Sequence, residues 1–127
     1  MILVDTAVWI DHLRTGNAAL VELLDRSSVI AHPWVIGELA LGNLSNRTEI
    51  LGLLHGLPQA TLARHDEVLG LIEHDALYGT GIGYVDAQLL AASRLTPDTR
   101  LWSTDKRLVA VARRLGLSFQ PSARHDR

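Results

Sequence analysis

The stretch that decides the fold is Met1-Ile-Leu-Val-Asp5-Thr-Ala-Val-Trp-Ile10-Asp-His-Leu-Arg14. Its first four residues form a short aliphatic run that is typical of a buried strand. Asp5 and Thr6 are both good helix N-cap residues, and the mixed apolar stretch behind them continues to Arg14. The pattern predicts a strand that is followed directly by a helix.

A strand followed by a helix is predicted again later in the chain. Residues 28–32 have the pattern of a short buried strand, and Pro33 suits the first position of a helix running to about Leu44. Strands that alternate with helices predict an α/β fold of three layers, with a central parallel sheet, helices on both faces and right-handed crossovers. The other predicted elements are helices over residues 18–25, 46–54, 64–77, 84–95 and 106–115 and strands over residues 100–103 and 117–120.

Length and composition limit the class of protein. The 127 residues suit a single domain over residues 1–127, in which we expect residues 122–127 to be a loose tail. A hydrophobic content of 47% against 20% charged residues excludes a disordered chain, and the lack of cysteine excludes disulfides and thiolate metal sites. The N-terminus lacks the basic stretch of a signal peptide, and no apolar run is long enough to cross a bilayer. We therefore expect a soluble, cytoplasmic protein without a membrane partner.

Two acids occupy equivalent places at the ends of predicted strands. Asp5 and Asp105 each lie where a strand passes into a helix, which puts both at the edge of a parallel sheet where sites are found in such folds. Asp is also a preferred N-cap, and helix N-termini favour negative charge. Capping therefore explains either residue taken alone.

Two further acids lie on predicted helices with almost no other charge. Glu38 is the only charge in its apolar helix, which predicts that the helix is buried and that Glu38 needs a salt bridge or a metal ion. Asp86 is the only charged residue between Tyr84 and Ser93, in a first turn where the helix dipole favours it. Capping does not explain why all four acids can reach one edge of the sheet.

Four carboxylates in one pocket repel each other strongly, and a bound divalent cation is the ordinary remedy. Oxygen ligands without Cys or a His pair favour Mg²⁺, or Mn²⁺ as a substitute, over zinc. None of the six histidines shows a paired ligand spacing. The chemistry that such a site performs best is phosphodiester hydrolysis, because the metal lowers the pKa of water and neutralises charge on the phosphate.

Four segments in this order resemble the PIN-domain ribonucleases, specifically the VapC toxins of toxin–antitoxin pairs. They are Asp5-Thr-Ala-Val-Trp-Ile-Asp11-His-Leu-Arg14, Glu38 in its helix, Gly81-Ile-Gly83-Tyr-Val-Asp86-Ala-Gln-Leu-Leu-Ala91-Ala and Leu101-Trp-Ser-Thr-Asp105-Lys-Arg-Leu108. The resemblance covers nearly the whole chain. It implies a PIN-like fold and a magnesium-dependent endoribonuclease that forms a homodimer and is inhibited by a small VapB-like antitoxin.

The resemblance also assigns residues. Its acidic quartet, which binds the metal and is catalytic, falls on Asp5, Glu38, Asp86 and Asp105, and a further catalytic residue, the hydroxyl beside the last acid, falls on Thr104. One departure is Ala7, where many relatives carry Ser after Asp-Thr. This departure affects a secondary hydrogen bond and leaves the metal site intact.

RNA binding needs a local patch of cations, because the net charge of −2 gives no general positive field. We expect several cations to flank the acidic edge, whereas Arg113 and Arg114 fit ordinary surface charge. We interpret the three tryptophans, Trp9, Trp34 and Trp102, as core or dimer contacts. The RNA-binding candidates are Arg14, Arg94, Arg100, Lys106 and Arg107.

Two other functions fit parts of the pattern. A receiver-like signalling domain has a similar length, alternation and Mg²⁺-binding acids, but it needs a phosphoacceptor Asp near mid-chain, and residues 46–60 contain none. A non-catalytic RNA-binding module is the second alternative. Intact acids at all four positions count against it.

Overall fold

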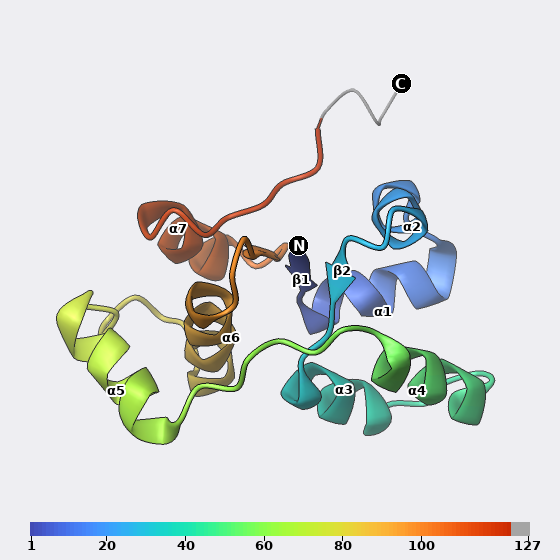
Figure 1. Cartoon of the computed structure of the whole chain (residues 1–127), viewed down its shortest axis with the longest axis horizontal. Helices are drawn as coiled ribbons and strands as arrows, with labels where there is room; N and C mark the ends of the chain where they lie inside the picture. Colours follow the sequence, from blue (N-terminus) through green and yellow to red (C-terminus); the bar gives the residue numbers. More distant parts are fainter. Residues whose placement is uncertain (123–127) are drawn as a thin grey trace.

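The computed structural model describes residues 1–122, so residues 123–127 of the predicted loose tail lie outside the described part. Three short strands and seven helices make up this described part, and each strand is followed by one or more helices (Figure 1). In chain order they are β1 (Ile2–Val4), α1 (Thr6–Thr15), α2 (Ala18–Asp25), β2 (Val29–Ile30), α3 (Pro33–Ala40), α4 (Arg47–Gly56), α5 (His65–His74), α6 (Tyr84–Leu95), β3 (Arg100–Trp102) and α7 (Lys106–Arg114).

The sheet confirms the predicted α/β class. β1 is its central strand and pairs in parallel with β2 on one side and β3 on the other, with Leu3 opposite both Ile30 and Leu101. All three residues of β1 are buried, as expected for a strand covered on both faces. In Figure 1 the strands lie between α6 and α7 on one side and α1 and α2 on the other, while α3, α4 and α5 line the lower edge.

Several predicted elements are shorter than expected, among them the helix predicted over residues 64–77, which ends at His74, and the strand predicted over residues 28–32, which covers Val29–Ile30. The strand predicted over residues 117–120 is a single parallel bridge between Leu101 and Ser118, so that prediction is wrong in its extent. The helix predicted to run to Leu44 ends at Ala40. The guanidinium of Arg47 donates hydrogen bonds to the carbonyls of Ala40 and Gly42, and these satisfy the acceptors left open at the end of α3.

The three tryptophans have different environments. Trp9 and Trp102 are almost fully buried in the core, which confirms that part of the prediction. Trp34 is 40% exposed on the outer side of α3, so it does not belong to the core. Among residues 1–122, no helix combines the length and apolarity that a membrane span requires.

His32 fixes the beginning of α3. Its ring is fully buried, and Nδ1 accepts a hydrogen bond from the backbone N–H of Trp34 at 3.0 Å, which caps the helix. Nε2 has no hydrogen-bond partner within the described residues. Burial lowers the pKa of His32 from 6.5 to about 4, so the ring is neutral in the folded protein at neutral pH.

This buried ring predicts a loss of stability in mild acid. Between pH 6.5 and about 4 the unfolded chain binds a proton at His32 that the folded chain does not, so the free energy of unfolding falls as the pH falls. The loss reaches about 3 kcal/mol. His32→Asn keeps a capping group but does not titrate, so denaturant unfolding at several pH values should give a flatter pH dependence for this variant. The exposed His55→Asn is the control, and an equal flattening there would contradict the assignment.

Candidate active site

Asp5 lies at the carboxyl end of the central strand and is only 9% exposed. Its Oδ1 accepts a hydrogen bond from the backbone N–H of Thr6 at 2.8 Å, which caps α1. Its Oδ2 accepts a hydrogen bond from Ser103 Oγ at 2.8 Å. The carboxylate therefore joins the end of β1 to the residue that follows β3.

Ser103 is the hydroxyl at the centre of this arrangement. Besides donating to Asp5, its Oγ accepts a hydrogen bond from the backbone N–H of Asp105 at 3.1 Å. Thr104, the predicted hydroxyl, is exposed, and its side chain makes no hydrogen bond within the described residues. Alternation beyond β3 could have identified Ser103, because it turns Ser103 toward Asp5 and Thr104 toward solvent.

Glu38 reaches the same edge from α3. Its Oε1 accepts a hydrogen bond from Thr6 Oγ1 at 2.7 Å, and Thr6 directly follows Asp5. The expectation that α3 is buried around Glu38 is wrong, because one side of the helix, with Trp34 and Glu38, is exposed. Burial therefore does not force Glu38 to have a partner, and the bond to Thr6 positions it.

Asp86 approaches the edge from the first turn of α6. Its Oδ2 accepts a hydrogen bond from the backbone N–H of Gly83 at 3.1 Å. The preceding loop passes Gly81, whose φ of +86° is in the left-handed region and whose missing Cβ would lie 2.8 Å from Cδ of Arg107. Glycine at position 81 thus lets the loop before Asp86 lie against the side chain of Arg107.

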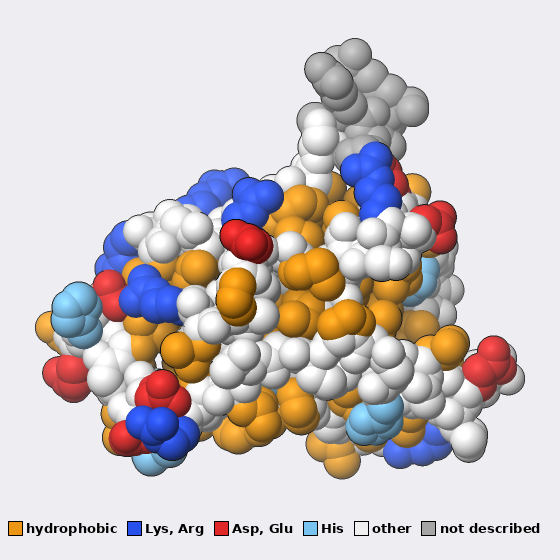
Figure 2. Space-filling model, viewed as in Figure 1, with side chains coloured by type: hydrophobic (Ala, Val, Ile, Leu, Met, Phe, Trp, Pro, Cys, Tyr) orange, Lys and Arg blue, Asp and Glu red, His pale blue; other side chains and the backbone are white. Residues whose placement is uncertain are grey.

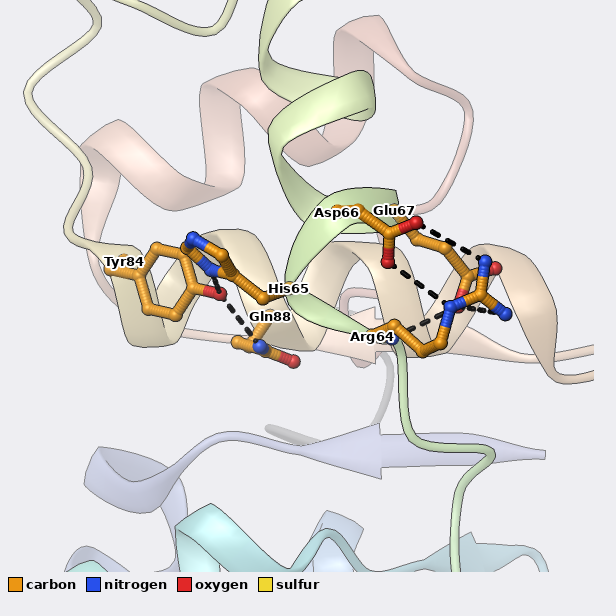
Figure 3. Close-up of polar contacts among 6 residues, drawn as sticks. All are labelled: Arg64, His65, Asp66, Glu67, Tyr84 and Gln88. Atoms are coloured by element: carbon orange, nitrogen blue, oxygen red, sulfur yellow. Dashed lines mark hydrogen bonds and ion pairs between the residues drawn. The ribbon is translucent and has the colours of Figure 1, made fainter.

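A polar network holds the beginning of α6 against α5 (Figure 3). The hydroxyl of Tyr84, the first residue of α6, lies 2.5 Å from Nδ1 of His65 and accepts a hydrogen bond from Gln88 at 3.0 Å. In the same view Arg64 contacts Asp66 and Glu67 at the start of α5. The network around Tyr84 fixes the turn of helix that carries Asp86, two residues further on.

Asp105 caps α7. Its Oδ1 accepts hydrogen bonds from the backbone N–H groups of Arg107 and Leu108 at 2.9 and 3.1 Å, as predicted for an N-cap. Its Oδ2 accepts none within the described residues and faces solvent with the exposed residue. The capping role therefore uses one oxygen of the carboxylate and leaves the other available.

Mutual repulsion shows that the acids share one region. Burial is the main cause that raises the pKa of Asp5 above its usual value, and the charges of Asp86 and Glu38 raise it further, while the hydrogen bonds from Ser103 and Thr6 oppose the shift. Burial also raises the pKa of Asp86, with added repulsion from Asp105 and Glu38. Each of the four carboxylates thus acts on at least one other.

The donor set fits a hard divalent cation. Among residues 1–122, no three acidic or histidine side chains are already gathered closely enough to hold one ion. Each carboxylate instead turns toward a protein donor, and Asp86 Oδ1, Asp105 Oδ2 and Glu38 Oε2 accept no hydrogen bond in the described part. Carboxylate oxygens at one edge are the ligand type that Mg²⁺ and Mn²⁺ prefer.

The predicted RNA-binding cations occupy different places. Lys106 and Arg107 are exposed in the first turn of α7, beside Asp105, and Arg14 lines the same cavity as Glu38. The expectation that Arg100 flanks the acidic edge is wrong, because it begins β3, whose other end leads to Ser103. Its guanidinium lies over the ring of Phe119, 5.5 Å from the centroid. Arg94 is paired with Asp75 at 2.9 Å.

A cavity of about 640 Å³ opens beside Glu38, between α1, α3 and the beginning of α4. Its apolar walls include Ile10, Leu13 and Leu39, and Arg14 lies at the same opening. The cavity therefore combines an apolar lining with one acid of the site and one cation.

Comparison with known proteins gives the family. No family model matches the sequence. The chain is 49% identical over 119 residues to Ribonuclease VapC32 of Mycobacterium tuberculosis, in each of two strains, and the match covers 94% of this chain and 96% of the relative. The chain belongs to the VapC family.

The fold agrees with this assignment. The solved structure of FitAB bound to an IR36 DNA fragment matches 89% of this chain and 91% of its own, with a TM-score of 0.61 and 20% identity. The VapC-family chain therefore has the PIN-domain fold that its sequence implied. The receiver-like alternative is excluded.

The burial of Asp5, together with the repulsion from Asp86 and Glu38, predicts the behaviour of Asp5→Asn. An acid with a raised pKa in the folded state makes folding less favourable as the pH rises above 3.8. Without divalent metal at pH 7, Asp5→Asn should therefore melt at or above the wild type, and its advantage should shrink near pH 3. Thermal melts in EDTA measure this, with the exposed Asp11→Asn on α1 as the control. Because Asn caps a helix about as well as Asp, an Asp5→Asn variant that melts with the wild type at both pH values would show that Asp5 acts only as a cap.

Proposed function

We propose that this chain is a Mg²⁺-dependent endoribonuclease and the toxin of a toxin–antitoxin pair. The observation that carries the proposal is the set of four mutually repelling carboxylates at the carboxyl edge of the sheet. The relative at 49% identity is named a ribonuclease, which supports RNA as the substrate. Mn²⁺ is the expected substitute for Mg²⁺.

The site residues divide into ligands and groups that orient them. Asp5, Glu38, Asp86 and Asp105 would hold the cation through the oxygens that the protein leaves open. When bound, the cation supplies an activated water and neutralises charge on the phosphate. Ser103 and Thr6 orient the carboxylates of Asp5 and Glu38 through their hydroxyls. Thr104, which the resemblance implied to be catalytic, would contact the RNA, because it is exposed directly before Asp105.

The cavity beside Glu38 suits a small antitoxin. Its apolar lining is continuous with exposed apolar residues, because Ile10 is 42% exposed and Leu41, at the end of α3, is 91% exposed. Glu38 and Arg14 at the same opening can pair with charges of the partner. We propose that a segment of a VapB-like antitoxin lies in this cavity, where it would cover Glu38 and block the site.

A second apolar face suits a homodimer. Trp34 of α3 contacts the ring of Tyr84 at 5.9 Å between centroids, and Tyr84 in turn contacts His65 of α5. Leu69 lies one helical turn beyond His65 and is 46% exposed, and Leu62, just before α5, is 52% exposed. Figure 2 shows apolar side chains along the lower edge of this view. We propose that a second copy of the chain covers this face.

Metal dependence is the first test of the proposed function. The purified chain should cleave single-stranded or loop RNA with Mg²⁺ or Mn²⁺, without zinc, and stop in EDTA. Glu38→Gln and Asp86→Asn should reduce cleavage by orders of magnitude. A hundredfold excess of Mg²⁺ over its Kd should stabilise the wild type by about 2.7 kcal/mol, and these variants by less. Glu49→Gln on α4 is the control, and full cleavage in EDTA would overturn the metal site.

The two apolar surfaces can be separated in one crossed experiment. Leu62→Glu should convert a dimer into a monomer in sedimentation velocity, because a charge on a buried apolar interface is unfavourable, and it should leave antitoxin binding intact. Ile10→Glu should weaken antitoxin binding at least tenfold by titration calorimetry and leave the dimer intact. A wild type that is monomeric at high concentration contradicts the dimer. Unchanged antitoxin binding by Ile10→Glu contradicts the cavity as its site.

A further inference from the structure

The cations of α7 differ from most others in the molecule. Within the described residues, Arg26, Arg64 and Arg94 form ion pairs with acids, Arg47 is bound to carbonyls, and Arg100 lies over Phe119. None of the four cations of α7 forms an ion pair in that part of the chain: Lys106, Arg107, Arg113 and Arg114. Figure 2 shows Lys and Arg side chains gathering over α7 at the upper left.

Two of these cations are held by the fold and two are free. The side chain of Arg107 lies against the backbone of Gly81, and Arg114 donates hydrogen bonds to the carbonyls of Asp75 and Ala76 at 2.9 and 3.4 Å. Lys106 and Arg113 make neither an ion pair nor a hydrogen bond within the described residues. They are seven residues apart, so they lie on one stripe of the helix, about 10.5 Å apart along its axis.

The helix dipole does not explain the cation at the start of α7. The N-terminal turn of a helix favours negative charge, yet Lys106 and Arg107 both lie there. The dipole favours Arg113 in the last turn, but it offers no reason for a free Lys106 on the same stripe. A polyanion along the stripe would offset the unfavourable position of Lys106.

A groove lies along the stripe of α7 that carries the two free cations. It has a volume of about 460 Å³, and Lys106 and Arg113 line it together with Val109 and Ala110. Its other lining residues are Ser103 and Thr104, next to Asp105, and Gln120, which donates a hydrogen bond to the carbonyl of Ser103 at 3.2 Å. The groove thus runs from Ser103 and Thr104, which follow β3, along α7 to Arg113.

We propose that this groove binds the phosphate backbone of the single-stranded RNA that enters the acidic site, with Lys106 and Arg113 as its phosphate contacts. The proposal rests on the proposed function and adds the path of the substrate. It assigns a role to Arg113, which the sequence alone left as ordinary surface charge. Thr104 lines the same groove directly before Asp105, and its exposed hydroxyl can donate a hydrogen bond to a phosphate oxygen.

The test measures RNA binding without cleavage. A labelled single-stranded RNA oligonucleotide is titrated with the purified chain in EDTA, by fluorescence anisotropy, at salt concentrations from about 50 to 200 mM. Each phosphate contact adds about 0.7 to the slope of log affinity against log salt, so Lys106→Gln with Arg113→Gln should reduce the slope by about 1.4. At about 0.1 M salt this corresponds to a loss of about 25-fold in affinity.

Matched variants decide the outcome. Arg26→Gln with Arg64→Gln removes the same charge from ion pairs elsewhere and should change the slope little. A control that loses as much affinity as the α7 variant, or a wild type that does not bind RNA, overturns the proposal. Arg114→Gln that weakens binding more than Arg113→Gln places the RNA on the other flank of α7 and also overturns it. The proposal is also overturned if the chain binds duplex DNA of equal length more tightly than the single-stranded RNA.

Cleavage assays in Mg²⁺ separate this proposal from the proposed function. If the wild type cleaves RNA and the α7 variant has an unchanged KM, the proposed RNA-binding groove is wrong and the proposed nuclease function stands. If the wild type does not cleave RNA, the proposed nuclease function is wrong, and the anisotropy measurement still decides whether α7 binds RNA. Melting temperatures close to that of the wild type show that each variant is folded.

Discussion

A carboxylate held below the surface at the end of the central strand is the constraint on which the rest of this structure depends. Removing an ionised group from water costs several kcal/mol, and hydrogen bonds must offset that cost. Asp5 receives two, from the backbone of Thr6 and from the hydroxyl of Ser103. Ser103 follows β3, and the side chain of Thr6 binds Glu38 of α3. One chain of hydrogen bonds therefore joins β1, β3 and α3 and positions the site at the same time.

Capping and ligand roles are compatible in this arrangement. Asp5 caps α1, Asp105 caps α7, and Asp86 binds the backbone N–H that precedes α6. At Asp86 and Asp105 one carboxylate oxygen satisfies the helix N-terminus and the other remains open. Because a helix N-terminus also lowers the cost of a negative charge, the three helix starts let a small domain hold acids close together. The sequence pattern left capping and catalysis as alternatives, and the geometry accommodates both.

The parts of the fold that could be predicted depend on local chemistry. Hydrophobic periodicity and N-caps place β1, α1 and α7, so Asp5 and Asp105 follow directly. The misplaced features depend on side-chain contacts that periodicity does not encode: Arg47 binds the carbonyl of Ala40, where α3 ends, and Ser103 donates to Asp5 across nearly the whole chain. The place of Arg100 could have been predicted from the sequence. Arg100 begins its strand, before the buried residues Leu101 and Trp102, whereas the acids follow the ends of the strands, so Arg100 lies at the opposite edge of the sheet.

The error at α3 has a physical cause that bears on function. A helix that is apolar nearly all round is normally buried, and the pattern from Trp34 to Leu44 predicted burial for that reason. In the single chain one side of this helix is exposed, and Leu41 is 91% exposed. The apolar pattern is therefore consistent with burial by other chains, such as the proposed second copy and antitoxin. Glu38 lies on the exposed side and beside the cavity, so the proposed antitoxin would approach this acid when it fills the cavity, and the proposed inhibition would follow from that placement.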